Sequence, residues 1–137
     1  MNKIVVPAKI ENLQKVLNFI NQELESVEYN ETLLLQLELS IEEAYVNIAN
    51  YAYELEDGDV LISCSIDKNP TQVTIQFIDC GNPYNPLDNE DPDTFSKIEE
   101  KEIGGLGILL IKKNVDFIGY EYKDGQNILT LKKVLDD

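Results

Sequence analysis

The sequence predicts an α+β fold, a two-layer α/β sandwich in which helices cover one face of a mostly antiparallel sheet. Three observations indicate this fold: a short strand pattern precedes two amphipathic segments, two pairs of β-rich segments are each joined by a short turn, and an apolar helix-like segment separates the pairs. With 137 residues, 43% of them hydrophobic, the chain is expected to form one domain over residues 1–137.

The first part of the chain predicts a strand and two helices. The strand "KIVVP" is expected to end at Pro7, because proline cannot donate to a sheet ladder. Apolar residues then recur every three or four positions, as on one side of an amphipathic helix: Ile10, Leu13, Val16, Leu17, Ile20 and Leu24. A longer helix is predicted from Asn30, a favourable N-cap, to about Glu54, where "EDGD" interrupts the pattern.

Two hairpins and one further helix complete the prediction. Residues 59–67 and 71–79 are β-rich and flank "KNP", and "FIGYEY" and "NILTLKKV" flank "KDGQ" in the same way. Between the hairpins, residues 80–105 are rich in Pro, Gly, Asn and Asp and have little apolar periodicity. Such a long segment is typically a functional lid or disordered. Residues 106–116 have helical spacing.

Charge and composition exclude several classes of function. Acidic residues outnumber basic ones 26 to 11, all of the latter Lys, and the net charge of −15 repels nucleic acid and anionic lipid. An acidic surface either keeps a protein soluble or attracts a basic partner. The chain has no His, which excludes Ser-His-Asp triads, Cys-His pairs and zinc-histidine sites. Proton transfer must therefore use carboxylates, Lys or Tyr.

Cysteine spacing and the N-terminus favour a cytoplasmic location. Cys64 and Cys80 are far from any C-x-x-C spacing, and "MNKIVVPAKI" has no long apolar run that resembles a signal peptide or a membrane span.

Candidate functional residues occur on the second predicted helix. Glu43 and Asn47 are four residues apart and share a face, with Asn50 and Tyr51 one turn further on. Asn47 can offer an amide oxygen to Mg²⁺, and Glu43 can act as a base. The alternative is a solvated polar face.

Two further stretches carry candidate residues. In "FIDCGNPYNP", Asp79 can accept a hydrogen bond from an exocyclic amine such as that of adenine, and Gly81 lets a planar ring approach the backbone. In "IGGLGILLIKK", Gly104, Gly105 and Gly107 can present N–H groups to an anion where a helix begins, although the loop matches neither a Walker A motif nor a dinucleotide fingerprint. Taken singly, both stretches also fit plain turns.

Together and in this order, "EEAYVNIANYAY", "DCGNPYNP", an acidic lid and "IGGLGILLIKKNVD" resemble the Bergerat nucleotide-binding fold of gyrase, histidine kinases and MutL. Within that superfamily the chain looks most like the bacterial anti-sigma factor serine/threonine kinases. The resemblance extends from Met1 through the final "GQNILTLKK" and implies ATP and Mg²⁺ as cofactors, with an ATP lid at about residues 87–103.

The resemblance also implies a role for each matching residue. Glu43 would be the catalytic base, and its competitor Glu42 lies five residues from Asn47 and so about 100° further round the helix. Asn47 would hold Mg²⁺, and Asp79 would accept from the adenine amino group with Gly81 beneath the ring. The implied ATP contacts are Asn47, Asn50, Tyr51, Asp79, Gly81, Gly104, Gly105, Leu106 and Gly107.

The chain departs from the family pattern in its cations. Relatives often place a basic residue where this chain has Asn50, and there is no Arg to clamp a phosphate through two hydrogen bonds. The remaining nearby cations are Lys97, Lys101, Lys112 and Lys113, for which a solvated surface is the alternative interpretation.

The function that the resemblance implies is an ATP-dependent serine/threonine protein kinase that acts as an anti-sigma regulatory factor. Its expected substrate is a STAS-domain antagonist protein, with a sigma factor as second partner and a homodimer as the expected assembly. Two alternatives stay open: an ATP- or ADP-sensing interaction module without kinase activity, and an ATPase that drives lid closure and dimerisation.

Overall fold

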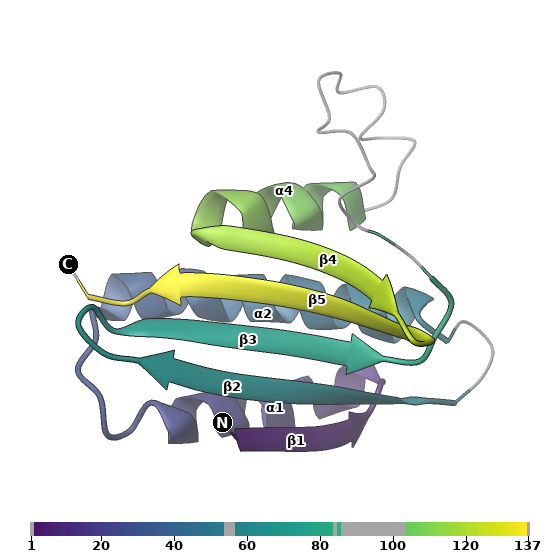
Figure 1. Cartoon of the computed structure of the whole chain (residues 1–137), viewed down its shortest axis with the longest axis horizontal. Helices are drawn as coiled ribbons and strands as arrows, with labels where there is room; N and C mark the ends of the chain where they lie inside the picture. The colour runs from purple at the N-terminus through teal and green to yellow at the C-terminus, as the bar shows by residue number, and fades with distance from the viewer. Residues whose placement is uncertain (1, 54–56, 84, 86–103, 137) are drawn as a thin grey trace.

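The computed structural model describes residues 2–53, 57–83, 85 and 104–136, and it leaves out the side chains of residues 104–107. The order of elements predicted from the sequence is confirmed (Figure 1). The elements are β1 (Asn2–Pro7), a short 3-10 helix (Ile10–Asn12), α1 (Leu13–Glu23), α2 (Glu31–Tyr51), β2 (Asp59–Asp67), β3 (Gln72–Asp79), α4 (Gly104–Asn114), β4 (Phe117–Lys123) and β5 (Gln126–Val134).

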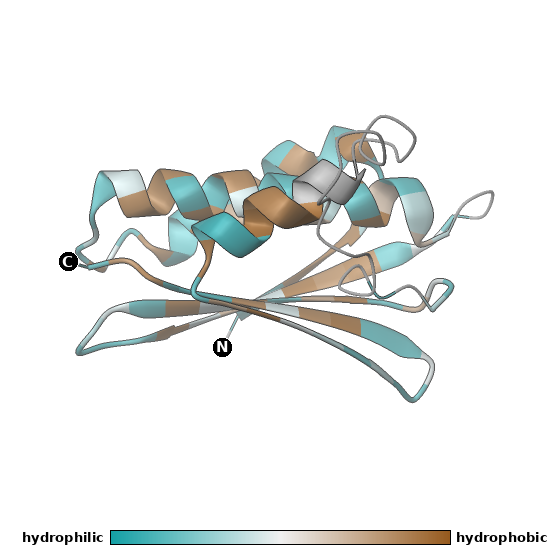
Figure 2. Cartoon of the chain, turned by 90° about the horizontal axis from the view of Figure 1, so that it is seen from above, coloured by the Kyte–Doolittle hydropathy of each residue, from teal (hydrophilic) through white to brown (hydrophobic). Residues whose placement is uncertain are grey.

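The described strands form one antiparallel sheet in the order β1-β2-β3-β5-β4. Figure 2 shows the helices as a layer on one side of this sheet. The predicted α+β fold, with helices on one face of an antiparallel sheet, is therefore confirmed. Because β5 lies between β3 and β4, Asn127 at the start of β5 pairs with Asp79 on one side and with Tyr122 on the other.

The hydrophobic core lies between the helices and the sheet. Every second residue of β3 and of β5 is buried, as expected for a sheet with one covered face. The largest fully buried side chains are Tyr45, Phe77, Ile20, Leu24, Leu37, Ile41, Ile62, Ile75, Ile111, Leu131, Leu135 and Val16. Since each buried Leu or Ile contributes about 1.5–3 kcal/mol, this core holds α2 firmly against the sheet.

The first two helices begin with polar side chains in defined positions. The predicted first helix starts as a 3-10 turn, in which the buried Asn12 donates from Nδ2 to the Pro7 carbonyl at 2.9 Å, and α1 follows from Leu13. Asn30 is the N-cap of α2, as predicted, and its side chain accepts from the Leu33 N–H at 3.1 Å.

Helix α4 begins earlier than its apolar periodicity predicts. The glycines from Gly104 form its first turn, whereas the sequence pattern predicts a loop there. Helical stability in proteins comes mostly from tertiary packing, and α4 buries Ile108 and Ile111 in the core beside α2. Within the described part of the chain, none of the helices combines the length and apolar character that crossing a membrane requires.

The buried Tyr45 ties α2 to the segment after β1. Its hydroxyl lies 3.0 Å from the Pro7 carbonyl oxygen and 2.6 Å from that of Lys9, where it can donate. Burial raises the pKa of Tyr45, so the hydroxyl keeps its proton over the physiological range. This contact fixes the rotation of α2 about its axis and hence the direction in which its polar residues point.

Candidate functional site

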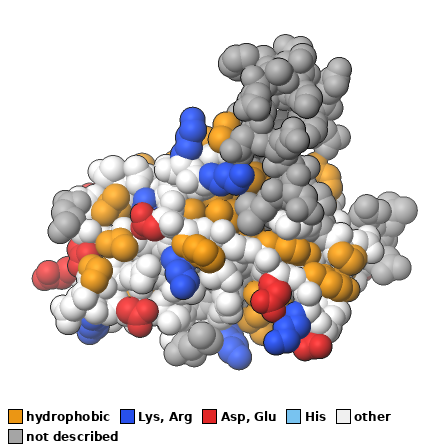
Figure 3. All heavy atoms as spheres, turned by 45° about the horizontal axis from the view of Figure 1, so that its top comes forward, with side chains coloured by type: hydrophobic (Ala, Val, Ile, Leu, Met, Phe, Trp, Pro, Cys, Tyr) orange, Lys and Arg blue, Asp and Glu red, His pale blue; other side chains and the backbone are white. Residues whose placement is uncertain are grey.

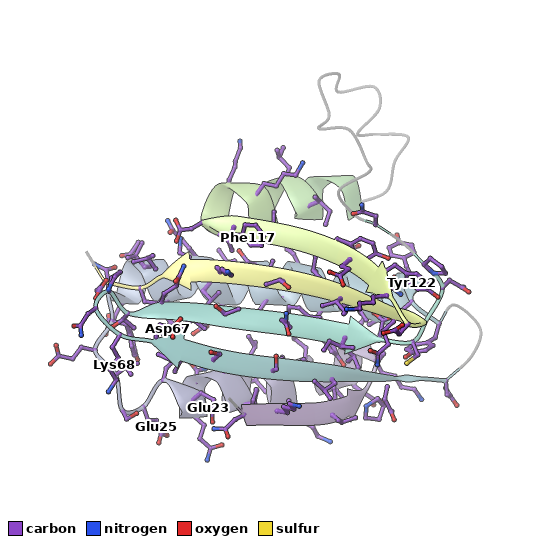
Figure 4. All side chains as sticks on the ribbon, viewed as in Figure 1. Glu23, Glu25, Asp67, Lys68, Phe117 and Tyr122 are labelled. Atoms are coloured by element: carbon purple, nitrogen blue, oxygen red, sulfur yellow. The ribbon has the colours of Figure 1, made fainter. Side chains whose placement is uncertain are left out.

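A pocket opens between α2 and the ends of β3, β4 and β5. In Figure 4, Tyr122 marks this end of the sheet, and Asp67 and Lys68 mark the opposite end. Apolar walls with a few converging polar groups are typical of small-molecule sites. The described lining residues are Ala44, Asn47, Ile48, Tyr51, Ala52, Phe77, Asp79, Asn82, Tyr120, Asn127 and Leu129.

Asp79 is the buried carboxylate of this pocket, with 5% of its surface exposed. Its Oδ1 accepts from the Gly81 N–H and from Asn127 Nδ2, both at 2.9 Å. Its Oδ2 takes part in none of the hydrogen bonds among the described residues. Among these residues, no side-chain oxygen that lacks a hydrogen-bond partner is fully buried. Oδ2 therefore keeps some solvent-accessible surface, and because Asp79 lines the pocket, this oxygen can accept from a ligand donor.

Gly81 lies against the end of α2. A Cβ built on Gly81 would lie 2.1 Å from the Ala52 carbonyl oxygen, a separation that backbone atoms cannot tolerate. The next N–H, that of Asn82, donates to the same carbonyl at 2.8 Å. The structure thus supplies a packing reason for glycine here, in addition to the approach of a planar ring that the sequence predicts.

Tyr53 holds the strand ends beside the pocket together. Its hydroxyl donates to the Asp59 carbonyl at 2.6 Å and accepts from the Cys80 N–H at 2.9 Å. Burial raises the pKa of Tyr53, which keeps the hydroxyl protonated and able to donate. The backbone just after Asp79 is therefore anchored to the start of β2.

The polar residues of α2 divide into two groups. Asn47 and Tyr51, four residues apart, are both half-buried and both line the pocket. Glu43, one turn before Asn47, is half-buried but is not among the described lining residues. Asn50 and Glu42 are exposed and also lie outside that lining. Of the two glutamates, Glu43 thus shares the covered face of Asn47.

The glycine-rich stretch starts α4 at the end of the sheet where β3 finishes (Figure 1). Gly104, Gly105, Leu106 and Gly107 form the first turn of α4. The first four N–H groups of an α-helix have no partner within the helix. A helical first turn therefore keeps the anion-binding capacity that the sequence predicts for these residues.

The lysines near these glycines are placed less favourably for phosphate. Lys112 and Lys113 lie in the last turn of α4, about 12 Å along the axis from its first turn, where they complement the negative end of the helix dipole. Lys97, Lys101 and the predicted lid, residues 87–103, lie outside the described residues. On the face that Figure 3 shows, basic side chains are scattered among acidic and apolar ones.

Asn127 and Tyr120 are polar residues of the pocket that the sequence did not indicate as candidate site residues. Asn127 is 6% exposed and donates from Nδ2 to the Asn82 carbonyl at 3.0 Å as well as to Asp79. The Tyr120 hydroxyl hydrogen-bonds to Asn127 Oδ1. The sequence contains one signal for Asn127, because it lies in step along β5 with the buried Leu129 and Leu131 and so is a polar residue on the covered face of the sheet.

The described residues fit a magnesium ion that binds together with a nucleotide. They contain no group of three or more His, Cys, Asp or Glu residues placed to hold a metal. Mg²⁺ in phosphate sites, however, takes one or two protein ligands and completes its shell with water and phosphate oxygens. The half-buried amide of Asn47 in the pocket wall suits this sparse type of site.

Comparison with known proteins agrees with the fold. The family described as Histidine kinase-like ATPase domain matches residues 6–133. The chain is also similar to the serine/threonine-protein kinase BtrW of Bordetella bronchiseptica, with 26% identity over 99 residues that cover 72% of this chain and 69% of that protein. The matched family residues take in all of the described pocket, and the chain belongs to the histidine kinase-like ATPase domain family.

Proposed function

We propose that this protein is an ATP-dependent serine/threonine protein kinase that acts as an anti-sigma regulatory factor and phosphorylates a STAS-domain antagonist. The observation that carries the proposal is that Asp79, from β3, lines the same pocket as Asn47 and Tyr51, from α2. Membership of the ATPase family and similarity to a protein named as a serine/threonine kinase support it.

In this proposal the inner part of the pocket binds adenine. Asp79 Oδ2 accepts from the exocyclic amine, since Oδ1 already has two protein donors. Ile48, Phe77 and Leu129 supply apolar surface for the faces of the ring. An uncharged planar base thereby enters an acidic protein without needing a cation.

The outer part binds the phosphates. Asn47 offers its amide oxygen to the Mg²⁺ that accompanies ATP, and the N–H groups of Gly104, Gly105 and Gly107 at the start of α4 face the phosphate oxygens. Bound Mg²⁺ neutralises charge on the transferred phosphoryl group. The first turn of α4 adds the positive end of the helix dipole.

Glu43 is the proposed base. During transfer, a substrate serine or threonine oxygen forms a bond to the γ-phosphorus, the bond from that phosphorus to the ADP oxygen breaks, and the hydroxyl proton passes to the Glu43 carboxylate. Glu43 lies one helical turn from Asn47 and is half-buried as Asn47 is, which supports a position near the proposed phosphates. Catalysis otherwise depends on positioning.

The proposal extends to the setting of the reaction: a cytoplasmic homodimer that exchanges a sigma factor for the STAS-domain antagonist. With 26 acidic and 11 basic residues, the chain has a net charge of −15, which suits attraction to a basic partner.

Two observations favour a second candidate, an ATP- or ADP-sensing module without kinase activity. Glu43 is not among the described residues that line the pocket, and the exposed Asn50 occupies a position that is often basic in relatives. In such a module, nucleotide binding would control partner binding without any phosphate transfer.

The deciding experiment incubates the purified protein with Mg-ATP and a STAS-domain protein and measures phosphoserine or phosphothreonine by mass spectrometry. Glu43→Gln is expected to lower the transfer rate by about 100-fold while ATP binding persists. Glu42→Gln, the exposed neighbour on α2, is the matched control and should retain the wild-type rate. Partner binding that depends on ATP but survives Glu43→Gln, with no phosphate on the partner, would favour the sensing module instead.

A further inference from the structure

We propose that Asn127, oriented by Tyr120, is a positioning residue that makes the pocket selective for a purine carrying an exocyclic amino group, because it holds Asp79 in one orientation. The inference rests on the proposed ATP-binding function and assigns a specificity role to residues of β4 and β5, where the sequence indicated no candidate site residue. Figure 4 shows the end of the sheet concerned, beside Tyr122.

The orientation of the Asn127 side chain follows from its partners. Nδ2 lies 2.9 Å from Asp79 Oδ1, 3.0 Å from the Asn82 carbonyl oxygen and 3.4 Å from that of Gly81. A carboxylate and two carbonyls can only accept, so the NH₂ group must face them. The amide oxygen then faces the Tyr120 hydroxyl, which donates to it.

This orientation determines what Asp79 offers to a ligand. Oδ1 is occupied by Asn127 Nδ2 and by the Gly81 N–H, so Oδ2 is the carboxylate oxygen that a bound base meets. An amino group on the ring donates to Oδ2. A ring carbonyl in the same place is another acceptor, and the two oxygens repel each other in a site where Asp79 is only 5% exposed.

Without the Asn127 amide, this selectivity should fall. Asp79 would keep one donor, the Gly81 N–H, and its side chain would be able to rotate. A rotated Asp79 no longer presents one fixed acceptor to the ring, while the apolar contacts of Phe77 and Leu129 with either base persist.

The experiment compares the dissociation constants of ATP and of inosine triphosphate, which carries a ring carbonyl in place of the amine. Wild type is expected to prefer ATP by at least about tenfold, the ratio that one hydrogen bond to a charged group supports. In Asn127→Ala the preference should fall below about threefold, and Tyr120→Phe should fall between the two. If Asn127 had only a structural role, its loss would weaken the binding of both nucleotides equally and leave the ratio of their dissociation constants unchanged.

The matched control is Gln76→Ala. Gln76 bridges β3 and β5 on the opposite face of the sheet, where its Nε2 donates to Thr130 Oγ1 at 3.2 Å. Removing this amide from the same pair of strands should leave the ATP preference at its wild-type value.

The outcomes separate this inference from the proposed function. If wild type binds neither nucleotide, both are overturned. If wild type binds the two nucleotides equally, or if it prefers ATP and Asn127→Ala and Tyr120→Phe keep that preference, the inference alone is overturned. Should Asn127→Ala lose its cooperative thermal transition, Tyr120→Phe decides by itself, and an unchanged ratio there contradicts the inference.

Discussion

The two ends of the proposed ATP site, the base end and the phosphate end, use different kinds of protein groups. At the base end, Asp79, Asn127 and Tyr120 come from three strands and are joined by side-chain hydrogen bonds. At the phosphate end, the proposed contacts are the Asn47 amide and the backbone of the first turn of α4. The base end should therefore be sensitive to single side chains, and the phosphate end to Mg²⁺ and the helix terminus. In the proposed binding mode, an acidic chain without arginine holds the phosphates of ATP mainly through backbone N–H groups, uncharged side chains and Mg²⁺.

The largest expected effect is at the base end, from Asp79→Asn. Replacing the charged acceptor by an amide should weaken ATP binding by about 10- to 100-fold, the range for one hydrogen bond to a charged group. Asp67→Asn, an exposed carboxylate at the far end of β2, is the control and should bind as wild type does. Titration calorimetry measures both, and a loss at Asp79 below about threefold would remove the distinction between the two ends.

Gly81→Ala should come next, because it distorts the base end through the backbone. A Cβ 2.1 Å from the Ala52 carbonyl oxygen must displace the segment that donates to Asp79. We expect the free energy of unfolding to fall by about 1–3 kcal/mol and ATP binding to weaken by about tenfold. Urea denaturation and nucleotide titration report the two effects.

Gly125→Ala is the matched control for that variant. Gly125 has a φ of 77° in the β4–β5 turn, and a Cβ added to it would meet no other described group within 4 Å. Alanine there should cost about 1 kcal/mol through backbone strain but should leave ATP affinity unchanged. Equal losses of affinity in the two variants would mean that general destabilisation, and not the base end, is responsible.

A smaller effect is expected at the phosphate end, from Asn47→Ala. Wild type should bind ATP about fivefold more tightly with Mg²⁺ than with a chelator present. The variant should lose most of this difference in affinity. Asn50→Ala, exposed and outside the described pocket lining, should keep the wild-type response to Mg²⁺. A loss in Asn50→Ala instead would show that the family pattern, rather than the described pocket, identifies the phosphate contacts.

The smallest effect is expected from Lys112→Ala and Lys113→Ala. Both residues lie in the last turn of α4, away from the first turn that is proposed to face the phosphates. Neither variant should change ATP affinity by more than about twofold, and the affinity should depend only weakly on salt concentration. A larger change would make side-chain cations part of the phosphate end.

Local patterns predicted part of the arrangement on α2. Helical periodicity alone indicates that Asn47 and Tyr51 share a face, and both line the pocket. The N-cap at Asn30 was equally predictable, because capping involves residues within one turn. The start of α4 at Gly104 was not, since the packing of Ile108 and Ile111 against the core extends the helix beyond what the glycines favour.

The sequence by itself determined the fold class and the order of the motifs, because periodicity and turn residues act over short stretches of chain, and the family followed from the resemblance that these motifs carry in this order. Only the tertiary structure decided which polar groups meet. Asp79 and Asn127 are 48 positions apart and become partners through the register of β3 against β5. Gly81 is required by the carbonyl of Ala52, which reaches it only because the core fixes α2 over the sheet. Contacts of this kind depend on strand order and helix packing, which no local pattern specifies.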